Sequence, residues 1–196
     1  GKIRKLDWSS GNVSDIPFRV SDSRAVIDPP RPPVVVAPAE FQTRMPRGVV
    51  SSPDGRTVVF ETLGKLWVKP AAGGAARRLT SAVDQMESYP TWSRDGKTIV
   101  YVAWTDKGLG EIRSIAASGG VSRKLSQQSG HYARPRFSPD GKTIVYEKGQ
   151  GGGLVSLRQS GEAGIYRIAS TGGAATRVTK GGASPHFGKL NDRIFY

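Results

Sequence analysis

Polar and hydrophobic residues follow the same pattern in three separate stretches of the chain. SSPDGRTVVF (51–60), WSRDGKTIVY (92–101) and FSPDGKTIVY (137–146) each place a polar tetrapeptide before alternating β-branched and aromatic residues. Within the tetrapeptide, Asp can bond its own downstream amide and Gly takes the positive φ that closes a hairpin. Each stretch therefore predicts two strands joined by a tight turn.

Other elements recur at matching distances from these turns. A strand with a proline two residues before an aromatic precedes the turn, as in YPTWS, ARPRFS and SPHFG. A strand ending near Gly-Gly comes later, as in KLWVKPAAGG, EIRSIAASGG and IYRIASTGG, and a short strand follows it, as in ARRLT, SRKLS and ATRVT. Units of four short strands that repeat about every 40 to 45 residues are typical of β-propeller blades.

The predicted fold is all-β, a β-propeller segment of four-stranded antiparallel blades, with three full blades and two half blades. We expect a segment of a larger propeller, although the two halves could also complete a ring of four blades. The predicted ranges are a half blade at 1–26, a proline-rich linker at 27–46, full blades at 47–80, 81–126 and 127–180, a loop insertion at 147–164 within the last of these, and the first half of a further blade at 181–196.

Composition agrees with a turn-rich fold and narrows the chemistry. The 196 residues include 25 Gly and 13 Pro, and no Cys, which excludes disulfides and thiol catalysis in this chain. No apolar run is long enough to span a bilayer, and the polar N-terminus lacks the apolar region of a signal peptide. We therefore expect neither a transmembrane segment nor a signal peptide in this chain.

The net charge of +13 raises the question of nucleic acid. Nucleic-acid binding would require basic residues interleaved with exposed aromatic residues on one face. Here a group of basic residues falls at equivalent places on the last strand of each unit, where charge opposes edge-to-edge aggregation. We predict a solvated basic rim and no nucleic-acid partner; the residues are Arg77, Arg78, Arg123, Lys124 and Arg177.

The repeated Ser-Pro-Asp-Gly-Lys/Arg-Thr-Ile/Val-Val-Tyr/Phe string, followed by Gly-Gly, resembles the TolB-type β-propeller repeat. The stretches SSPDGRTVVFETLGKLWV and LVSLRQSGEAGIYRIASTGG are also similar to bacterial exported amidohydrolase-related proteins, which place such a propeller before a metal-dependent hydrolase barrel. This resemblance implies a non-catalytic module that scaffolds or gates a catalytic domain absent from the chain. It also implies a periplasmic or secreted location, and a partner that is the rest of the parent chain or another protein.

Two alternatives remain open. One is a stand-alone TolB-type propeller that binds a protein in the cell envelope, and the other is the propeller of a prolyl-oligopeptidase-type serine hydrolase. The His-x-His metal pair of the amidohydrolase-related family has no match, because the chain has only His131 and His186. Gly-x-Ser-x-Gly and phosphate-binding loops are also missing from the sequence. We therefore predict no catalytic, cofactor-binding or metal-binding residue in this chain, and any metal would belong to a missing domain.

The strand order predicts two different faces. The uniform Ser-Pro-Asp-Gly and Gly-Gly turns fall on one face, and the irregular connections fall on the other. Because binding residues often lie on irregular loops held by a rigid scaffold, that second face is the predicted contact face. The alternative is that the same side chains pack between blades. The candidates are Tyr89, Trp104, His131, Tyr132, Arg134, Arg158 and His186.

Overall fold

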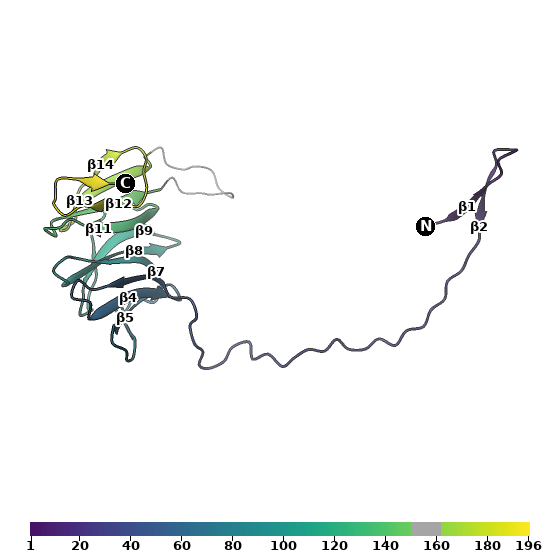
Figure 1. Cartoon of the computed structure of the whole chain (residues 1–196), viewed down its shortest axis with the longest axis horizontal. Helices are drawn as coiled ribbons and strands as arrows, with labels where there is room; N and C mark the ends of the chain where they lie inside the picture. The colour runs from purple at the N-terminus through teal and green to yellow at the C-terminus, as the bar shows by residue number, and fades with distance from the viewer. Residues whose placement is uncertain (150–161) are drawn as a thin grey trace. The chain divides into compact units, whose positions relative to one another are not determined.

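The computed structural model describes residues 1–149 and 162–196 (Figure 1). The chain divides into two compact units, Gly1–Phe41 and Gln42–Tyr196, and each is described by itself. Within the described residues every regular element is a strand. No helix among them is long and apolar enough to cross a membrane.

The C-terminal unit contains three four-stranded antiparallel sheets, whose strands pair in sequence order. The first blade is β3 (Arg47–Ser51), β4 (Thr57–Thr62), β5 (Lys65–Pro70) and β6 (Arg77–Arg78). The second is β7 (Met86–Trp92), β8 (Thr98–Thr105), β9 (Leu109–Ala116) and β10 (Arg123–Lys124). The third is β11 (Tyr132–Phe137), β12 (Thr143–Lys148), β13 (Gly164–Ala169) and β14 (Thr176–Thr179).

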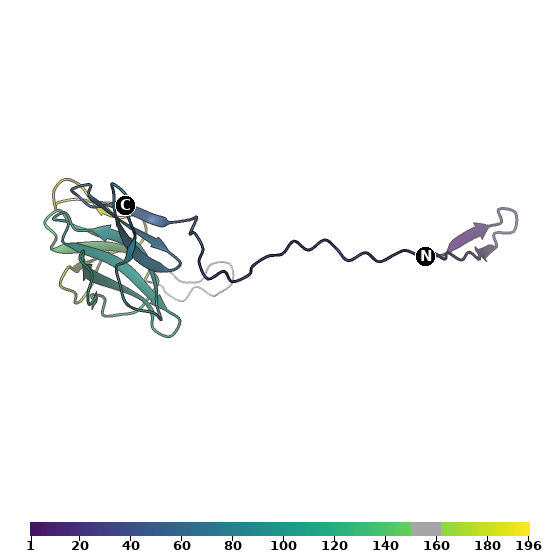
Figure 2. The same cartoon turned by 90° about the horizontal axis from the view of Figure 1, so that it is seen from below.

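A two-stranded sheet of β15 (His186–Phe187) and β16 (Ile194–Phe195) follows the third blade, and β1 (Ile3–Leu6) pairs with β2 (Val13–Ile16) in the N-terminal unit. Figures 1 and 2 show the sheets of the C-terminal unit following one another in chain order. The predicted fold class, three full blades and two half blades of antiparallel strands, is confirmed.

The Ser-x-Asp-Gly turns have the same hydrogen bonds in all three full blades. In the third blade, Ser138 Oγ donates to Asp140 Oδ1 at 2.5 Å and accepts from the backbone N–H of Thr143 at 2.9 Å. The amide of Lys142 donates to the same carboxylate oxygen at 3.0 Å, and Gly141 takes a φ of 72°. Hydrogen bonds from the serine hydroxyl and the lysine amide lower the pKa of Asp140. The local sequence alone therefore fixes the turn.

Two hydrophobic clusters lie between consecutive blades and form the core. Alternate residues of a strand face opposite sides of its sheet, so each blade contributes one set of side chains to the blade before it and another to the blade after it. The cluster between the first and second blades contains Val59, Leu66, Val68, Leu79, Ile99, Tyr101, Ala103 and Ile115. The cluster between the second and third blades contains Val100, Val102, Ile112, Leu125, Tyr132, Ile144, Tyr146, Tyr166 and Ile168.

The N-terminal unit is a hairpin followed by an extended segment without strands between residues 17 and 41. Asp7 closes the hairpin turn, where its carboxylate accepts from the Ser9 hydroxyl at 2.7 Å and from the Ser10 amide at 3.0 Å. These bonds lower the pKa of Asp7 to about 2. The apolar side chains of Ile3 and Leu6 stay exposed, and a lone two-stranded hairpin has little stability of its own.

Candidate functional site

The first strand of each full blade carries a β-bulge at one repeated position, and the residue two before β15 has the same backbone conformation. These residues are Gly48, Tyr89, Arg134 and Ser184, with φ values of 55°, 53°, 50° and 55°. In the three full blades, the strand pairing shifts register at this point. Only the first of these residues is a glycine, so the other three hold a conformation that costs of the order of 1–3 kcal/mol.

Carboxylates from the preceding blade accept hydrogen bonds from the backbone at two of these four positions. The backbone N–H of Tyr89 donates to Glu61 Oε2 at 3.2 Å, and the backbone N–H of Ser184 donates to Glu147 Oε1. Glu61 and Glu147 occupy the same place on the second strand of their blades. Each lies four residues after the threonine that begins this strand, Thr57 or Thr143. The second blade has Val102 at this place, so its carboxylate is missing.

Arg134 contacts a carboxylate through its side chain, whereas Tyr89 and Ser184 do so through their backbone N–H groups. Its Nη1 lies 2.9 Å from Glu147 Oε2 and 3.0 Å from Oε1, and its guanidinium carbon lies 5.8 Å from the centre of the Tyr89 ring. Tyr89 is 41% exposed and the Arg134 side chain 45% exposed, so both remain accessible. The residues therefore form a continuous polar row along the first and second strands of consecutive blades, which we call the bulge row: Glu61, Tyr89, Arg134, Glu147 and Ser184.

The remaining aromatic and histidine candidates form two separate pairs. The ring centres of Trp104 and His131 are 4.8 Å apart, and the Trp104 indole N–H donates to Asp106 at 3.3 Å. His186 stacks on Phe195, with ring centres 5.5 Å apart. The described residues contain no group of three or more His, Cys, Asp or Glu that could hold a metal ion.

Tyr132 is not part of an exposed contact face in this structure. It is 7% exposed and belongs to the core between the second and third blades, where its hydroxyl donates to the carbonyl of Gln128 at 3.0 Å. For this candidate the packing alternative describes the geometry, because the ring fills the space between two sheets. Arg158 lies outside the described residues.

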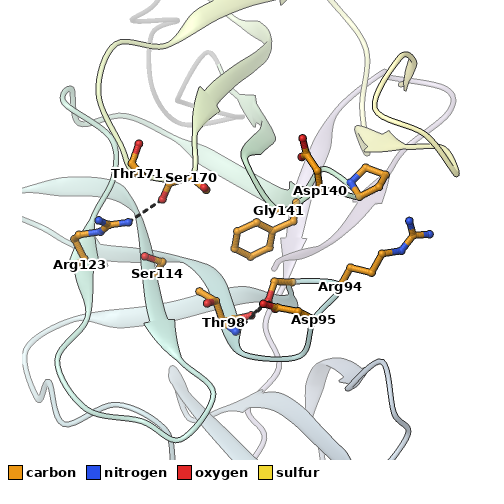
Figure 3. A pocket seen from close by; sticks show the side chains of 12 residues that line it. Arg94, Asp95, Thr98, Ser114, Arg123, Asp140, Gly141, Ser170 and Thr171 are labelled. Atoms are coloured by element: carbon orange, nitrogen blue, oxygen red, sulfur yellow. Dashed lines mark hydrogen bonds between the residues drawn. The ribbon is translucent and has the colours of Figure 1, made fainter.

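The turn face also has a hollow, between the second and third blades (Figure 3). The cavity is about 270 Å³ and is lined by Arg94, Asp95, Ser114, Arg123, Asp140 and Thr171, among others. Asp95 accepts from the Ser93 hydroxyl at 2.6 Å, which lowers the pKa of its carboxyl. Both aspartates serve their turns, and the structure shows no acid–base pair in this hollow among the described residues.

Arg123 has a structural contact that the sequence did not predict. Its Nη2 donates to the carbonyl of Ser170 at 2.9 Å, as the dashed line in Figure 3 shows. Arg77 makes the equivalent contact with the carbonyl of Ala117, at 3.3 Å, one blade earlier. These two arginines, which we predicted only as a solvated rim, also join the last strand of one blade to the third-to-fourth-strand turn of the next.

No protein-family profile and no curated protein sequence matches the chain. Solved structures do match its fold. A structure reported as a TolB from Agrobacterium tumefaciens has a TM-score of 0.55 and 24% identity, over 69% of this chain and 46% of that one. TolB from Acinetobacter baumannii has a TM-score of 0.52 and 22% identity, over 67% of this chain and 32% of that one.

A puromycin-hydrolyzing peptidase of Mycobacterium tuberculosis has a TM-score of 0.51 and 18% identity, over 67% of this chain and 22% of that one. The chain thus spans less than half the length of each of these proteins. At these identities the likeness concerns the fold alone. The chain has the fold of a fragment of a TolB-like β-propeller.

Proposed function

We propose that this chain is a non-catalytic propeller module of a larger protein, which binds the rest of that protein through blade-to-blade contacts. The observation that carries the proposal is the face of the first blade that points away from the second. We call it the rear face, and it is formed by Val58, Phe60 and Trp67, which are only partly buried.

In the second and third blades, the equivalent face is buried against the preceding blade. Ile99 and Tyr101 stand where Val58 and Phe60 stand in the first blade, and both are 0% exposed. Ile144 and Tyr146 are the third-blade equivalents, with 0% and 2% exposure. Within the C-terminal unit, the first blade therefore has the apolar side chains of an interface between blades without another blade against them.

Glycines of the third-to-fourth-strand turns give the same result independently. A Cβ added at Gly119 would meet Leu79 O at 3.2 Å, and one at Gly172 would meet Leu125 O at 3.1 Å. Both oxygens belong to the preceding blade. Gly73 has the same place in the first blade and a φ of 114°, yet nothing lies within 4 Å of its added Cβ. The first blade thus keeps the glycine of a blade contact that no residue of the C-terminal unit makes.

The parent protein proposed first is a metal-dependent hydrolase of the amidohydrolase-related type, whose catalytic domain this propeller would scaffold or gate. That choice rests on the sequence resemblance. It assigns any metal to the other domain and a periplasmic or secreted location to the protein. The structural likeness to two TolB proteins supports a TolB-type binding propeller as a second candidate. The likeness to a peptidase is compatible with the third candidate, the propeller of a serine hydrolase.

The test is the mass and sequence of the intact polypeptide from its source, measured under denaturing conditions. The proposal predicts a mass far above the 21.0 kDa of this chain. A His-x-His pair in the remaining sequence would favour the amidohydrolase-type parent, and Gly-x-Ser-x-Gly would favour the serine hydrolase. A chain with neither motif would favour the binding propeller, and a polypeptide of only 21 kDa would overturn the module proposal.

A further inference from the structure

A cavity of about 410 Å³ lies between the second and third blades, away from the bulge row. Its volume falls within the range of sites for small molecules, roughly 300–1,000 Å³. Residues of the loop after the last strand of the second blade form one side, and residues of the third blade form the other. The lining includes Ser126, Gln127, Tyr132, Tyr146, Lys148 and Tyr166.

The preceding interface shows why this space exists. Two residues before the bulge, the second blade has Glu87 and the third has Tyr132. Glu87 is 1% exposed and accepts from the Leu66 amide at 3.0 Å and from the Thr80 hydroxyl at 2.6 Å. It thereby ties the first blade to the second. Tyr132 offers no carboxylate, and the Ile112 amide donates instead to Ser126 Oγ at 3.1 Å.

Tyrosine rings form a wall of this cavity. The rings of Tyr132 and Tyr146 meet edge to face with centres 5.3 Å apart, and those of Tyr146 and Tyr166 stack with centres 5.9 Å apart. The Tyr132 and Tyr166 hydroxyls donate to backbone carbonyls at 3.0 Å and 2.7 Å. The Tyr146 hydroxyl has no hydrogen-bond partner among the described residues, and burial raises its pKa, so it stays a neutral donor at physiological pH.

The charges beside the rings favour an anion. The Lys148 side chain is only 11% exposed, and its Nζ lies 5.4 Å from the centre of the Tyr166 ring and 2.7 Å from Glu162 Oε2. Arg177 adds a second positive charge to the lining. Glu162, with a side chain 66% exposed, is the single carboxylate among the described lining residues, so the cationic groups outnumber it.

We propose that this cavity binds a small ring compound carrying one carboxylate. The ring would pack against the tyrosine wall, and the carboxylate would accept from the Tyr146 hydroxyl and lie near the Lys148 ammonium. This site is separate from the blade contacts that carry the proposed function, so either proposal can fail alone. An aromatic carboxylate and a sugar acid share the required chemistry.

The probes are the carboxylates phenylacetate and glucuronate. Two compounds that keep the phenyl ring serve as controls: phenethylamine, which is positively charged, and 2-phenylethanol, which is neutral. Backbone amide shifts of the full 196-residue chain would be followed by NMR during each titration. We expect saturable shifts with phenylacetate or glucuronate, centred on Ser126–Gln128 and Gly173–Arg177. Saturation by phenylacetate alone would identify an aromatic ligand, and saturation by glucuronate alone a sugar acid. Equal binding of 2-phenylethanol and phenylacetate, without glucuronate binding, would contradict the anion assignment.

Tyr146→Phe should weaken binding about three- to tenfold, the value of one hydrogen bond, while keeping the ring wall. Tyr101→Phe is the matched control, because Tyr101 has the same place one blade earlier, and it should leave binding unchanged. Ala174→Trp, at an exposed part of the rim, should block the cavity even if Tyr146→Phe proves unstable. Unchanged shifts in the Ala174→Trp variant, or no saturable shifts with either carboxylate, would overturn the proposal.

Discussion

The guanidinium carbon of Arg134 lies 5.8 Å from the centre of the Tyr89 ring, although the two residues belong to different blades. Both sit at the same bulge position of their first strands, with φ values near 50°. The contact shows how the repeat brings equivalent positions together on one edge. At Tyr89 and Ser184, hydrogen bonds from the backbone to a carboxylate of the preceding blade offset the strain.

The first prediction concerns this row. Arg134→Met should lower the free energy of unfolding by about 0.5–1 kcal/mol, because it removes a half-exposed ion pair and a cation–π contact. Chemical denaturation would measure it, with Arg167→Met, an exposed arginine of β13, as the control. A double-mutant cycle with Glu147→Gln should give a favourable coupling energy that shrinks in high salt. A coupling energy of zero would show that the Arg134–Glu147 ion pair does not contribute to stability.

The second prediction concerns the turn. Ser138→Ala should cost about 1–2 kcal/mol, because it removes the buried acceptor of the Thr143 amide and the donor to Asp140. Thermal or urea unfolding would measure the loss. Ser129→Ala, at an exposed serine in the loop before β11, should change the free energy of unfolding much less. Equal losses in the two variants would contradict the assigned role of the turn hydroxyl.

The turn aspartates also predict how stability depends on pH. Hydrogen bonds from the neighbouring serine hydroxyls lower the pKa of Asp54, Asp95 and Asp140 in the folded state. A lowered folded-state pKa means that their contribution is present above the pKa of the unfolded chain. It is lost as the pH falls towards the folded-state pKa. The variant in which all three aspartates are replaced by Asn should therefore lose less unfolding free energy on acidification than the unsubstituted chain. Urea unfolding at a series of pH values would measure this, and the same loss in both proteins at low pH would contradict it.

The sequence predicted the strands and turns because their chemistry is local. Ser138, Asp140 and Thr143 lie within six residues, so the repeated string contains every partner of the turn. Tyr89 and Arg134 of the bulge row were among the predicted candidates, but their partners Glu61, Glu147 and Ser184 were missed for the opposite reason. Glu61 and Tyr89 are 28 residues apart. In addition, the second blade has Val102 where the other two blades have Glu, so the carboxylate does not recur in every repeat. The recurring Glu of ETLG and EKGQ was the available clue.

The burial of Tyr132 was also beyond a reading of the repeat. Its equivalent in the second blade is Glu87, a charged residue. Comparison of the repeats therefore does not predict a core residue at this position. Glu87 is buried because Leu66 and Thr80 of the first blade supply its donors. Tyr132 is buried because it packs against Tyr146 of the neighbouring strand, in the core between the second and third blades. Such environments depend on how sheets pack, which the alternation within one strand does not encode.

A further prediction uses two equivalent glycines. In the isolated chain, Gly172→Ala should cost about 1 kcal/mol more than Gly73→Ala. Both positions need a positive φ, but only the Gly172 substitution places a Cβ 3.1 Å from a backbone oxygen of the preceding blade. Denaturation of the two variants would measure the difference. In the intact parent protein the difference should shrink, because a further blade would lie against Gly73.

The rear face of the first blade offers the most direct measurement of the central claim. Hydroxyl-radical footprinting would compare oxidation of Phe60 and Trp67 in the isolated chain and in the intact protein from its source. Tyr101, the buried equivalent of Phe60, would serve as the internal control in both samples. We predict that Phe60 and Trp67 are oxidised in the isolated chain and protected in the intact protein. Equal oxidation of both residues in the two samples would contradict the claim that this face docks against a further part of the protein.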